Sequence, residues 1–306
     1  MTDLQYSFPA MGSAVEIVAL GARPGSMQRC QQFVGDLERS WSRFLPNSEL
    51  ERLNATAGSG PQRCSPLLCD AVDASLALWR ATDGLFDPTT RDALEWCGYD
   101  RDFARVRERS ELSARCSPRP VVPTPQGVVV DHEQGLISLP RGVRLDLGGV
   151  GKGLAADLVA ALLVEQGALA ACVSVGGDIA TAGQHPDGGW LIPVLDPSHA
   201  DRVGWELLLG QGAVVQSNRV VRSWGPAGEH HHLIDPRTGL PARSGVLGVV
   251  VRDERAWWAE GVAKAALVAG PVDGAKLLQR LVRAAWIIHD TGAVTPVGDI
   301  AVERAA

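Results

Sequence analysis

The sequence has little of the composition that marks nucleic-acid-binding or membrane proteins. Its 306 residues carry 29 Lys and Arg against 35 Asp and Glu, for a formal net charge of -6, with no basic run or stripe. We therefore expect no nucleic-acid partner, because such proteins carry a clustered positive surface. Uninterrupted apolar runs stay shorter than the about 20 residues that cross a bilayer, so we expect no membrane span.

Features of secreted proteins and of disulfide or zinc scaffolds are also missing. Residues 1–6 have neither a basic n-region nor an apolar h-region, from which we expect no signal peptide and a cytoplasmic protein. The six cysteines form no CxxC pair and no zinc pattern, so we expect all of them to be reduced and structural. With only two Tyr and five Phe, we expect the nine Trp to provide much of the aromatic packing in the core.

The apolar periodicity predicts a mixed set of helices and strands. The predicted helices cover 28–44, 65–82, 154–166, 256–269 and 272–282. The predicted strands cover 13–20, 170–175, 190–195, 205–209, 212–216 and 245–252, with hairpins at 127–139 and 284–297. Residues 100–126 are polar and rich in Arg and Pro, which predicts an irregular surface segment. The elements do not alternate strictly as βαβ units, so we expect an α/β fold of the α+β type and no Rossmann sheet.

Two common phosphate-binding patterns, the P-loop and GxGxxG, are absent. In their place, residues 145–153 (LDLGGVGKG) combine an acid, Asp146, four glycines and Lys152 directly before a predicted helix. Glycines let the backbone approach a ligand closely, and a helix N-terminus offers free N–H groups and a positive dipole end. The block predicts a site for a phosphorylated ligand. The alternative is an ordinary strand-to-helix turn.

Five further motifs accompany this Gly-Lys block. They are residues 10–13 (AMGS), 43–54 (RFLPNSELERLN), 84–89 (GLFDPT), 175–179 (VGGDI) and 231–241 (HHLIDPRTGLP). In this order the six motifs resemble the ApbE family of FAD:protein FMN transferases, and they span about residues 8–270. The resemblance implies one intertwined domain over residues 1–306, with mostly antiparallel sheets and a flavin cleft. It also implies transfer of FMN from FAD onto a Thr or Ser hydroxyl of an acceptor flavoprotein, with release of AMP.

The resemblance assigns flavin contacts to eight residues of these motifs. They are Met11, Phe44, Leu85, Phe86, Asp87, Asp146, Lys152 and Ile234. Other interpretations stay open for several of them. Phe44 could continue the apolar face of the helix before it, Asp87-Pro88 could form a plain turn, and Asp146 could be an acid at a helix N-terminus.

His232 is the candidate for the catalytic base. An imidazole titrates near neutrality, which suits removal of the proton from an acceptor hydroxyl. A hydrogen-bonded structural histidine is the alternative. His232 ends a run of three histidines. Side chains alternate across a strand, so only His230 and His232 could share a ligand, and we do not expect a metal there.

The expected metal site departs from the family pattern. Relatives carry ADALAT on the late helix, where the Asp and Thr bind magnesium together with a backbone carbonyl at the position of Gly149. Here the matching residues 259–264 read AEGVAK, so Glu260 replaces the Asp and Lys264 replaces the Thr. This leaves Mg²⁺ open.

Three arrangements are possible for Glu260 and Lys264, which lie four residues apart on a predicted helix. The Lys264 ammonium could stand in place of the ion, tethered by Glu260. Magnesium could still bind through Glu260, the Gly149 carbonyl and phosphate oxygens. The two side chains could also form a solvent-facing ion pair. The alternative function is a flavin-binding or FAD-hydrolysing relative with little transferase activity.

Overall fold

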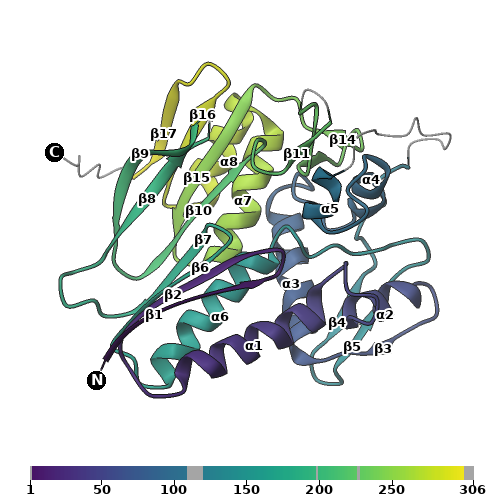
Figure 1. Ribbon diagram of the computed structural model, residues 1–306. Helices are drawn as coiled ribbons and strands as arrows, with labels where there is room; N and C mark the ends of the chain where they lie inside the picture. Colours follow the sequence, from purple (N-terminus) through teal and green to yellow (C-terminus); the bar gives the residue numbers. More distant parts are fainter. Residues whose placement is uncertain (1, 109–119, 198, 226–227, 300–306) are drawn as a thin grey trace.

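An antiparallel sheet of eight strands forms the centre of the fold (Figure 1). The computed structural model describes residues 2–108, 120–197, 199–225 and 228–299. The strands are β1 Thr2–Ala10, β2 Ser13–Ala22, β6 Ala170–Val175, β7 Asp178–Gly183, β10 Gly212–Asn218, β15 Val246–Asp253, β16 Ala284–His289 and β17 Val294–Gly298. They lie in the order β1-β2-β6-β7-β10-β15-β16-β17, and each neighbouring pair is antiparallel.

Helices cover one face of this sheet, and a two-stranded ribbon covers part of the other. The helices are α1 Ser26–Trp41, α3 Pro66–Ala81, α6 Gly151–Glu165, α7 Ala256–Ala269 and α8 Pro271–Leu281. The ribbon pairs β8 Trp190–Asp196 with β9 His199–Leu209. In Figure 1, α6 and α7 lie along the sheet, and α3 lies beyond them.

Successive side chains of the central strands enter two different cores. Val249 and Val251 of β15 join the helix-side core, whereas Val250 between them packs with Trp286 in the core under the β8–β9 ribbon. Strand side chains alternate between faces, so a strand covered on both sides buries every residue. This explains why β15 reads as a continuous apolar run instead of an alternating one.

Smaller elements surround the end of the helix layer (Figure 1). They are α2 Glu49–Ala55, α4 Arg91–Trp96, α5 Phe103–Arg107, the three-stranded sheet of β3 Gln62–Arg63, β5 Leu136–Ser138 and β4 Val129–Asp131, and the pairs β11 Ser223–Trp224 with β12 His230–His231 and β13 Ile234–Asp235 with β14 Leu240–Pro241. These short elements supply several of the residues discussed below.

The predicted fold class is confirmed, and so are the predicted long helices and most of the predicted strands. The elements that were not predicted include β1, α2 and β7, the short helices α4 and α5, and the two-residue strands β3 and β11 to β14. The prediction for residues 100–126 is wrong over α5, where Asp102 caps the Ala104 N–H at 2.9 Å and Val106 is buried. The part of that segment at 109–119 lies outside the described residues. Within the described ranges, the helices are too short or too polar to cross a membrane.

The structure also tests the expectations for the tryptophans and the cysteines. Trp41, Trp224 and Trp286 are buried, and five further tryptophans pack partly buried against the core clusters, so tryptophan provides much of the aromatic packing, as expected. Five of the cysteines are free thiols in the described part of the chain, as expected. The sixth, Cys116, lies outside the described residues.

The N-terminal half of α6 is hydrogen-bonded to the first turn of α7. Asp157 of α6 accepts hydrogen bonds from the backbone N–H groups of Ala256 (3.0 Å) and Trp257 (3.1 Å), the first residues of α7. These are donors that a helix start leaves unpaired, and Arg255 at the cap position supplies no side-chain acceptor. A Cβ on Gly153 would come within 2.5 Å of the Ala256 carbonyl, so only glycine permits this approach.

We predict that Asp157→Ala lowers the free energy of unfolding by about 1–2 kcal/mol, the usual effect of losing a helix cap. Urea denaturation followed by circular dichroism measures the change. Glu165→Ala, at an exposed position on the same helix, is the matched control and should change stability little. Equal stabilities for the two variants would contradict a capping role for Asp157.

Candidate functional site

One cleft collects the residues that the sequence analysis singled out. Its volume is about 840 Å³, within the usual range for small-molecule and cofactor sites. Eleven of the twelve predicted site residues line it: Met11, Phe44, Leu85, Phe86, Asp87, Asp146, Gly149, Lys152, His232, Ile234 and Lys264. The twelfth, Glu260, is fully buried and contacts Lys264, which does line the cleft. Residues from five of the six motifs, together with Lys264 of the late helix, therefore meet in space.

The β1–β2 turn contributes Met11 in a conformation that is uncommon for a non-glycine residue. Met11 has φ 53° and Gly12 has φ 65°, the pattern of a two-residue turn with both central residues left-handed. The Met11 N–H donates to the carboxylate of Glu38 on α1 at 2.9 Å. Such backbone strain persists only where neighbouring contacts hold it, and it is concentrated at functional sites.

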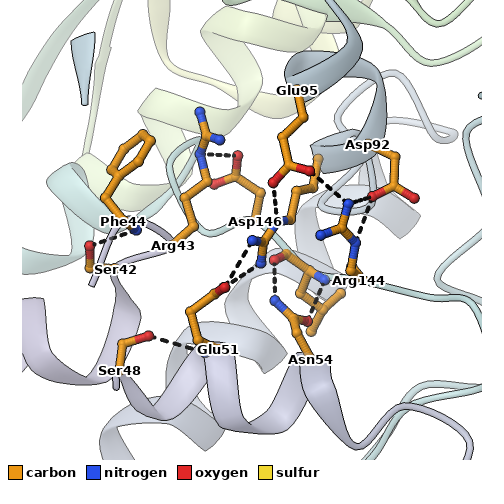
Figure 2. A network of polar contacts seen from close by, with 12 residues as sticks. Ser42, Arg43, Phe44, Ser48, Glu51, Asn54, Asp92, Glu95, Arg144 and Asp146 are labelled. Carbon is orange, nitrogen blue, oxygen red and sulfur yellow. Dashed lines mark hydrogen bonds and ion pairs between the residues drawn. The ribbon is translucent and has the colours of Figure 1, made fainter. Parts of the chain in front are cut away.

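Asp146 is held in place through both its backbone and its side chain (Figure 2). The side-chain amide of Asn54 donates to the Leu145 carbonyl at 2.9 Å and accepts from the Leu145 N–H at 2.8 Å. The Asp146 N–H donates to the Pro88 carbonyl at 2.8 Å. One carboxylate oxygen accepts from the Gly148 N–H at 2.7 Å, and the other pairs with Arg43 at 3.0 Å. Asp146 is therefore a positioned, buried anion in the cleft wall.

Arg43 lies between two aromatic rings. Its guanidinium carbon is 4.2 Å from the Phe44 ring centroid and 4.5 Å from that of Tyr99, and Arg43 also donates to the Tyr99 carbonyl at 2.9 Å. Phe44 stays 37% exposed. It follows the end of α1 at Trp41, so the interpretation that it continues the apolar face of that helix is wrong. The cleft thus has a wall of aromatic and cationic groups.

A second polar network supports this wall from behind (Figure 2). Arg91 of α4 is buried and pairs with Glu51 of α2 and with Glu95, to which its Nε lies at 2.8 Å. Arg144 pairs with Asp92 and, at 2.8 Å, with Glu95. The network joins α2, α4 and the segment that leads into the Gly-Lys block, so Asn54 and Leu145 are held at a constant separation.

Asp87 combines a turn with a place in the cleft. Its Oδ1 accepts from the Thr89 N–H at 2.7 Å and from the Thr89 hydroxyl at 2.6 Å, a side-chain-to-backbone turn. Burial raises the pKa of Asp87 to about 6, although the Thr89 hydrogen bonds oppose this. A Cβ on Gly149 would come within 2.8 Å of the Phe86 ring, so the block can lie against this segment only through a glycine.

The Gly-Lys block differs from expectation in one respect, because α6 begins inside it at Gly151. Lys152 therefore lies in the first turn of the helix, where its ammonium pairs with Asp178 and lies 3.6 Å from Glu260. Burial alone would lower the pKa of Lys152, but the carboxylates of Asp178 and Glu260 outweigh it and keep the pKa above its ordinary value. The lysine stays charged.

Glu260 connects the block to α7. Its Oε2 accepts from the Gly153 N–H at 2.8 Å, and its Oε1 accepts from the Lys264 ammonium at 2.7 Å. Burial would raise the pKa of Glu260, but Lys264, Lys152 and the Gly153 N–H outweigh it and hold the pKa below its ordinary value. The interpretation of Glu260 and Lys264 as a solvent-facing pair is wrong, because their side chains are 0% and 12% exposed.

These residues do not fit a magnesium site. Both oxygens of Glu260 already accept hydrogen bonds, and Lys264 is a donor that cannot ligate a cation. Nowhere in the described ranges do three His, Cys, Asp or Glu side chains gather in an arrangement that could hold a metal ion. The Gly149 carbonyl would be left without the carboxylate oxygens that Mg²⁺ requires.

His232 borders the cleft with no hydrogen-bond partner for its Nδ1 among the described residues. Its backbone N–H donates to the Arg222 carbonyl at 3.3 Å. Burial, followed by the positive charges of Arg222, Lys264 and Lys152, holds the pKa of His232 well below its ordinary value. The imidazole is therefore neutral at neutral pH, and the same charges make it a weak base in the empty cleft.

The neighbouring histidines have other surroundings. The buried His231 bonds the Ala242 carbonyl through Nε2 at 3.0 Å, and His230 stacks on Trp224 with centroids 6.1 Å apart. His231 therefore has an environment different from that of His232, as the predicted alternation of faces requires. Burial lowers the pKa of His231 to about 4.

Three cleft residues were missed by the sequence analysis: Arg43, Tyr99 and Arg222. The only available signal was for Arg43, which begins one of the six motifs. Arg222 donates to the Tyr99 hydroxyl at 3.0 Å and to Ser13 at 3.1 Å, contacts across 123 and 209 residues that no local pattern indicates. Asp178, in the 175–179 motif, pairs with Lys152 through its carboxylate.

We predict that acid unfolding depends on His231. Its pKa is about 4 in the folded protein against an ordinary 6.5, so the unfolded chain binds more protons between these values. Stability is therefore full above pH 6.5 and decreases as the pH falls toward 4, by up to roughly 3 kcal/mol. Urea titrations from pH 7 to pH 4 measure this. His231→Gln should make the decrease smaller and leave the part due to His232, whose pKa is also lowered by burial, whereas His199→Gln, at an exposed position, should leave it unchanged.

Comparison with known proteins supports the likeness seen in the motifs. A model of the ApbE family matches residues 11–287. The chain is 29% identical to the FAD:protein FMN transferase of Rhodobacter capsulatus over 95% of its own length, but it spans only 56% of that relative. It is 27% identical to the FAD:protein FMN transferase of Vibrio cholerae, over 89% of this chain and 83% of the relative.

Solved structures show the same fold. The ApbE protein of Thermotoga maritima superposes with a TM-score of 0.82 at 24% identity, over 97% of both chains. The flavin transferase ApbE of Vibrio cholerae superposes with a TM-score of 0.77 at 21% identity, also over 97% of both chains.

Proposed function

The chain belongs to the ApbE family, and from this we propose that it is an FAD:protein FMN transferase. It would move FMN from FAD onto a Thr or Ser hydroxyl of an acceptor flavoprotein and release AMP. Relatives from three bacteria carry the same name. The observation that carries the proposal is the convergence of eleven predicted site residues on one cleft of about 840 Å³.

The cleft offers suitable surfaces to the pyrophosphate and the flavin ring of FAD. The start of α6 turns its positive dipole end toward a pyrophosphate, and Lys152 and Lys264 add two ammonium groups beside it. Phe44 and Met11 provide apolar contact for the flavin ring, as does the 85–86 segment. Stacking of an aromatic base on such a ring contributes about 1–3 kcal/mol in nucleic-acid systems, and a flavin should be comparable.

The transfer is a phosphoryl-type substitution. The acceptor oxygen attacks the phosphorus on the FMN side, a new P–O bond forms, and the P–O bond to AMP breaks as AMP leaves. The hydroxyl proton must go to a base, and we assign this role to the neutral imidazole of His232. The bound pyrophosphate would offset the charges of Arg222, Lys152 and Lys264, and so raise the basicity of His232 during the reaction.

The direct test is to incubate the purified protein with FAD and a flavodoxin-like acceptor carrying a Thr or Ser site. We expect the acceptor to gain the mass of FMN less one water and AMP to appear in equal amount. Formation of AMP and free FMN without a change in acceptor mass would instead favour the FAD-hydrolysing alternative, which the names of the relatives do not support. Neither product would reject both functions.

We predict that Lys152→Ala weakens FAD binding, because a charge-assisted phosphate contact contributes about 1.5–3 kcal/mol. Titration of FAD fluorescence gives the affinity. Lys152 also neutralises Asp178, so Lys152→Ala/Asp178→Asn is measured in parallel to avoid a stranded buried carboxylate. Wild-type affinity in both variants would remove Lys152 from the phosphate site.

We predict that His232→Asn slows transfer by about 10²–10⁴-fold, the usual effect of losing a general base, while FAD affinity stays near that of wild type. The rate of acceptor flavinylation, followed by mass spectrometry, measures this. His230→Asn, which changes a neighbouring histidine that stacks on Trp224, is the control and should transfer at nearly the wild-type rate. Full activity in His232→Asn would pass the role to another group, such as Asp235.

A further inference from the structure

Four charged side chains form a polarised cluster at the wall of the cleft. The ammonium groups of Lys152 and Lys264 line the cleft, and their side chains are 17% and 12% exposed. Behind them, the carboxylates of Asp178 and Glu260 are 2% and 0% exposed. The four charges sum to zero, but only the two lysines of the cluster line the cleft. A bound anion would meet two cations first.

Lys264 is fixed in this place by its surroundings. Its Nζ lies 2.7 Å from Oε1 of Glu260, one turn earlier on α7, and Glu260 is itself anchored to the Gly153 N–H at 2.8 Å. The Lys264 stem runs beside the Gly-Lys block, since a Cβ on Gly149 would lie 3.8 Å from Lys264 Cδ. The cation is thus preorganised next to the N–H groups at the start of α6, with little side-chain freedom to lose on binding.

The same contacts leave Glu260 with no free carboxylate oxygen for a metal ion. Each oxygen of Glu260 accepts a hydrogen bond, one from the Gly153 N–H and one from Lys264. Replacing the Lys264 ammonium by a metal ion would therefore require breaking a buried ion pair. An ammonium carries one positive charge where a divalent ion carries two. In a partly desolvated cleft, however, even one charge near a phosphate oxygen attracts far more strongly than it does in bulk water.

We propose that the Lys264 ammonium is a built-in cation that holds the phosphate groups of the flavin nucleotide, so that this chain binds FAD without a divalent metal ion. This inference rests on the proposed function, because it presupposes that the cleft binds a flavin nucleotide. It assigns to Glu260 the role of a positioning residue, which orients Lys264 and does not touch the ligand.

The test compares FAD affinity in EDTA with that in Mg²⁺, by fluorescence titration, for wild type and Lys264→Met. We expect the wild-type affinity to be equal in the two conditions. Lys264→Met should bind FAD roughly 10- to 100-fold more weakly in EDTA, the effect of one lost charge-assisted contact. Lys276→Met, which removes an exposed lysine of α8, is the control and should bind as wild type does.

Two further measurements keep the test decisive. Electron paramagnetic resonance of Mn²⁺ added to the wild type with FAD should show no ion bound by the protein. If Lys264→Met fails to fold, Glu260→Gln/Lys264→Met removes both charges and keeps an acceptor for the Gly153 N–H. This double variant should show the same weakened FAD binding in EDTA.

The outcomes separate the two proposals. Wild-type protein that binds FAD only after Mg²⁺ is added would overturn the built-in cation and leave the transferase proposal standing. Wild-type affinity for FAD in both Lys264 variants would also overturn it. Absence of FAD binding with and without Mg²⁺ would reject the proposed function, and the inference with it.

Discussion

The buried carboxylate of Glu260 is the interaction on which the construction of the cleft depends. A charge with no exposed surface is tolerated only when hydrogen bonds and opposite charges surround it. Glu260 meets this requirement with the Gly153 N–H on one oxygen and the Lys264 ammonium on the other, with Lys152 at 3.6 Å. The separation of α6 and α7 and the placement of both cleft lysines follow from this one requirement.

Glycine positions make this arrangement sterically possible. At Gly153 a Cβ would come within 2.5 Å of the Ala256 backbone, and at Gly261 a Cβ would come within 2.3 Å of the Leu78 side chain. The two glycines let α7 approach α6 on one side and α3 on the other. Glu260 lies beside Gly261 in the same tight stretch of α7, and its carboxylate therefore reaches the first turn of α6 and no solvent.

The opposite wall depends on a different kind of contact, between segments far apart in the sequence. Asn54 forms a pair of hydrogen bonds with Leu145 across 91 residues, and Arg43 pairs with Asp146. These contacts fix the Gly-Lys block from the side of α2, while Glu260 fixes it from the side of α7. A binding site held from two sides in this way would change little when a ligand binds, which keeps the ordering penalty small. The chemistry proposed for the cleft needs such rigidity, because positioning and electrostatics account for most of the catalysis of phosphoryl transfer.

The sequence by itself determined the family, the long helices and the kinds of group that meet in the cleft. Six motifs in a set order carry that information, and apolar periodicity places α3, α7 and α8 within a residue or so of their ends. Elements such as β1 and α5 were not predicted, because their formation depends on pairing partners and local caps. Arg222 and Tyr99 were missed for the same reason, since their contacts join distant segments.

Only the tertiary structure decided what Glu260 and Lys264 do. Their spacing along a helix is the same whether that face of the helix meets solvent or the core, so the sequence alone left three arrangements open. The packing of α7 against α6 and the sheet removes Glu260 from water. A desolvated carboxylate must then use both oxygens on the partners at hand, which are the Gly153 N–H and Lys264. Burial is a property of the whole fold, and here burial determines which charges face the ligand.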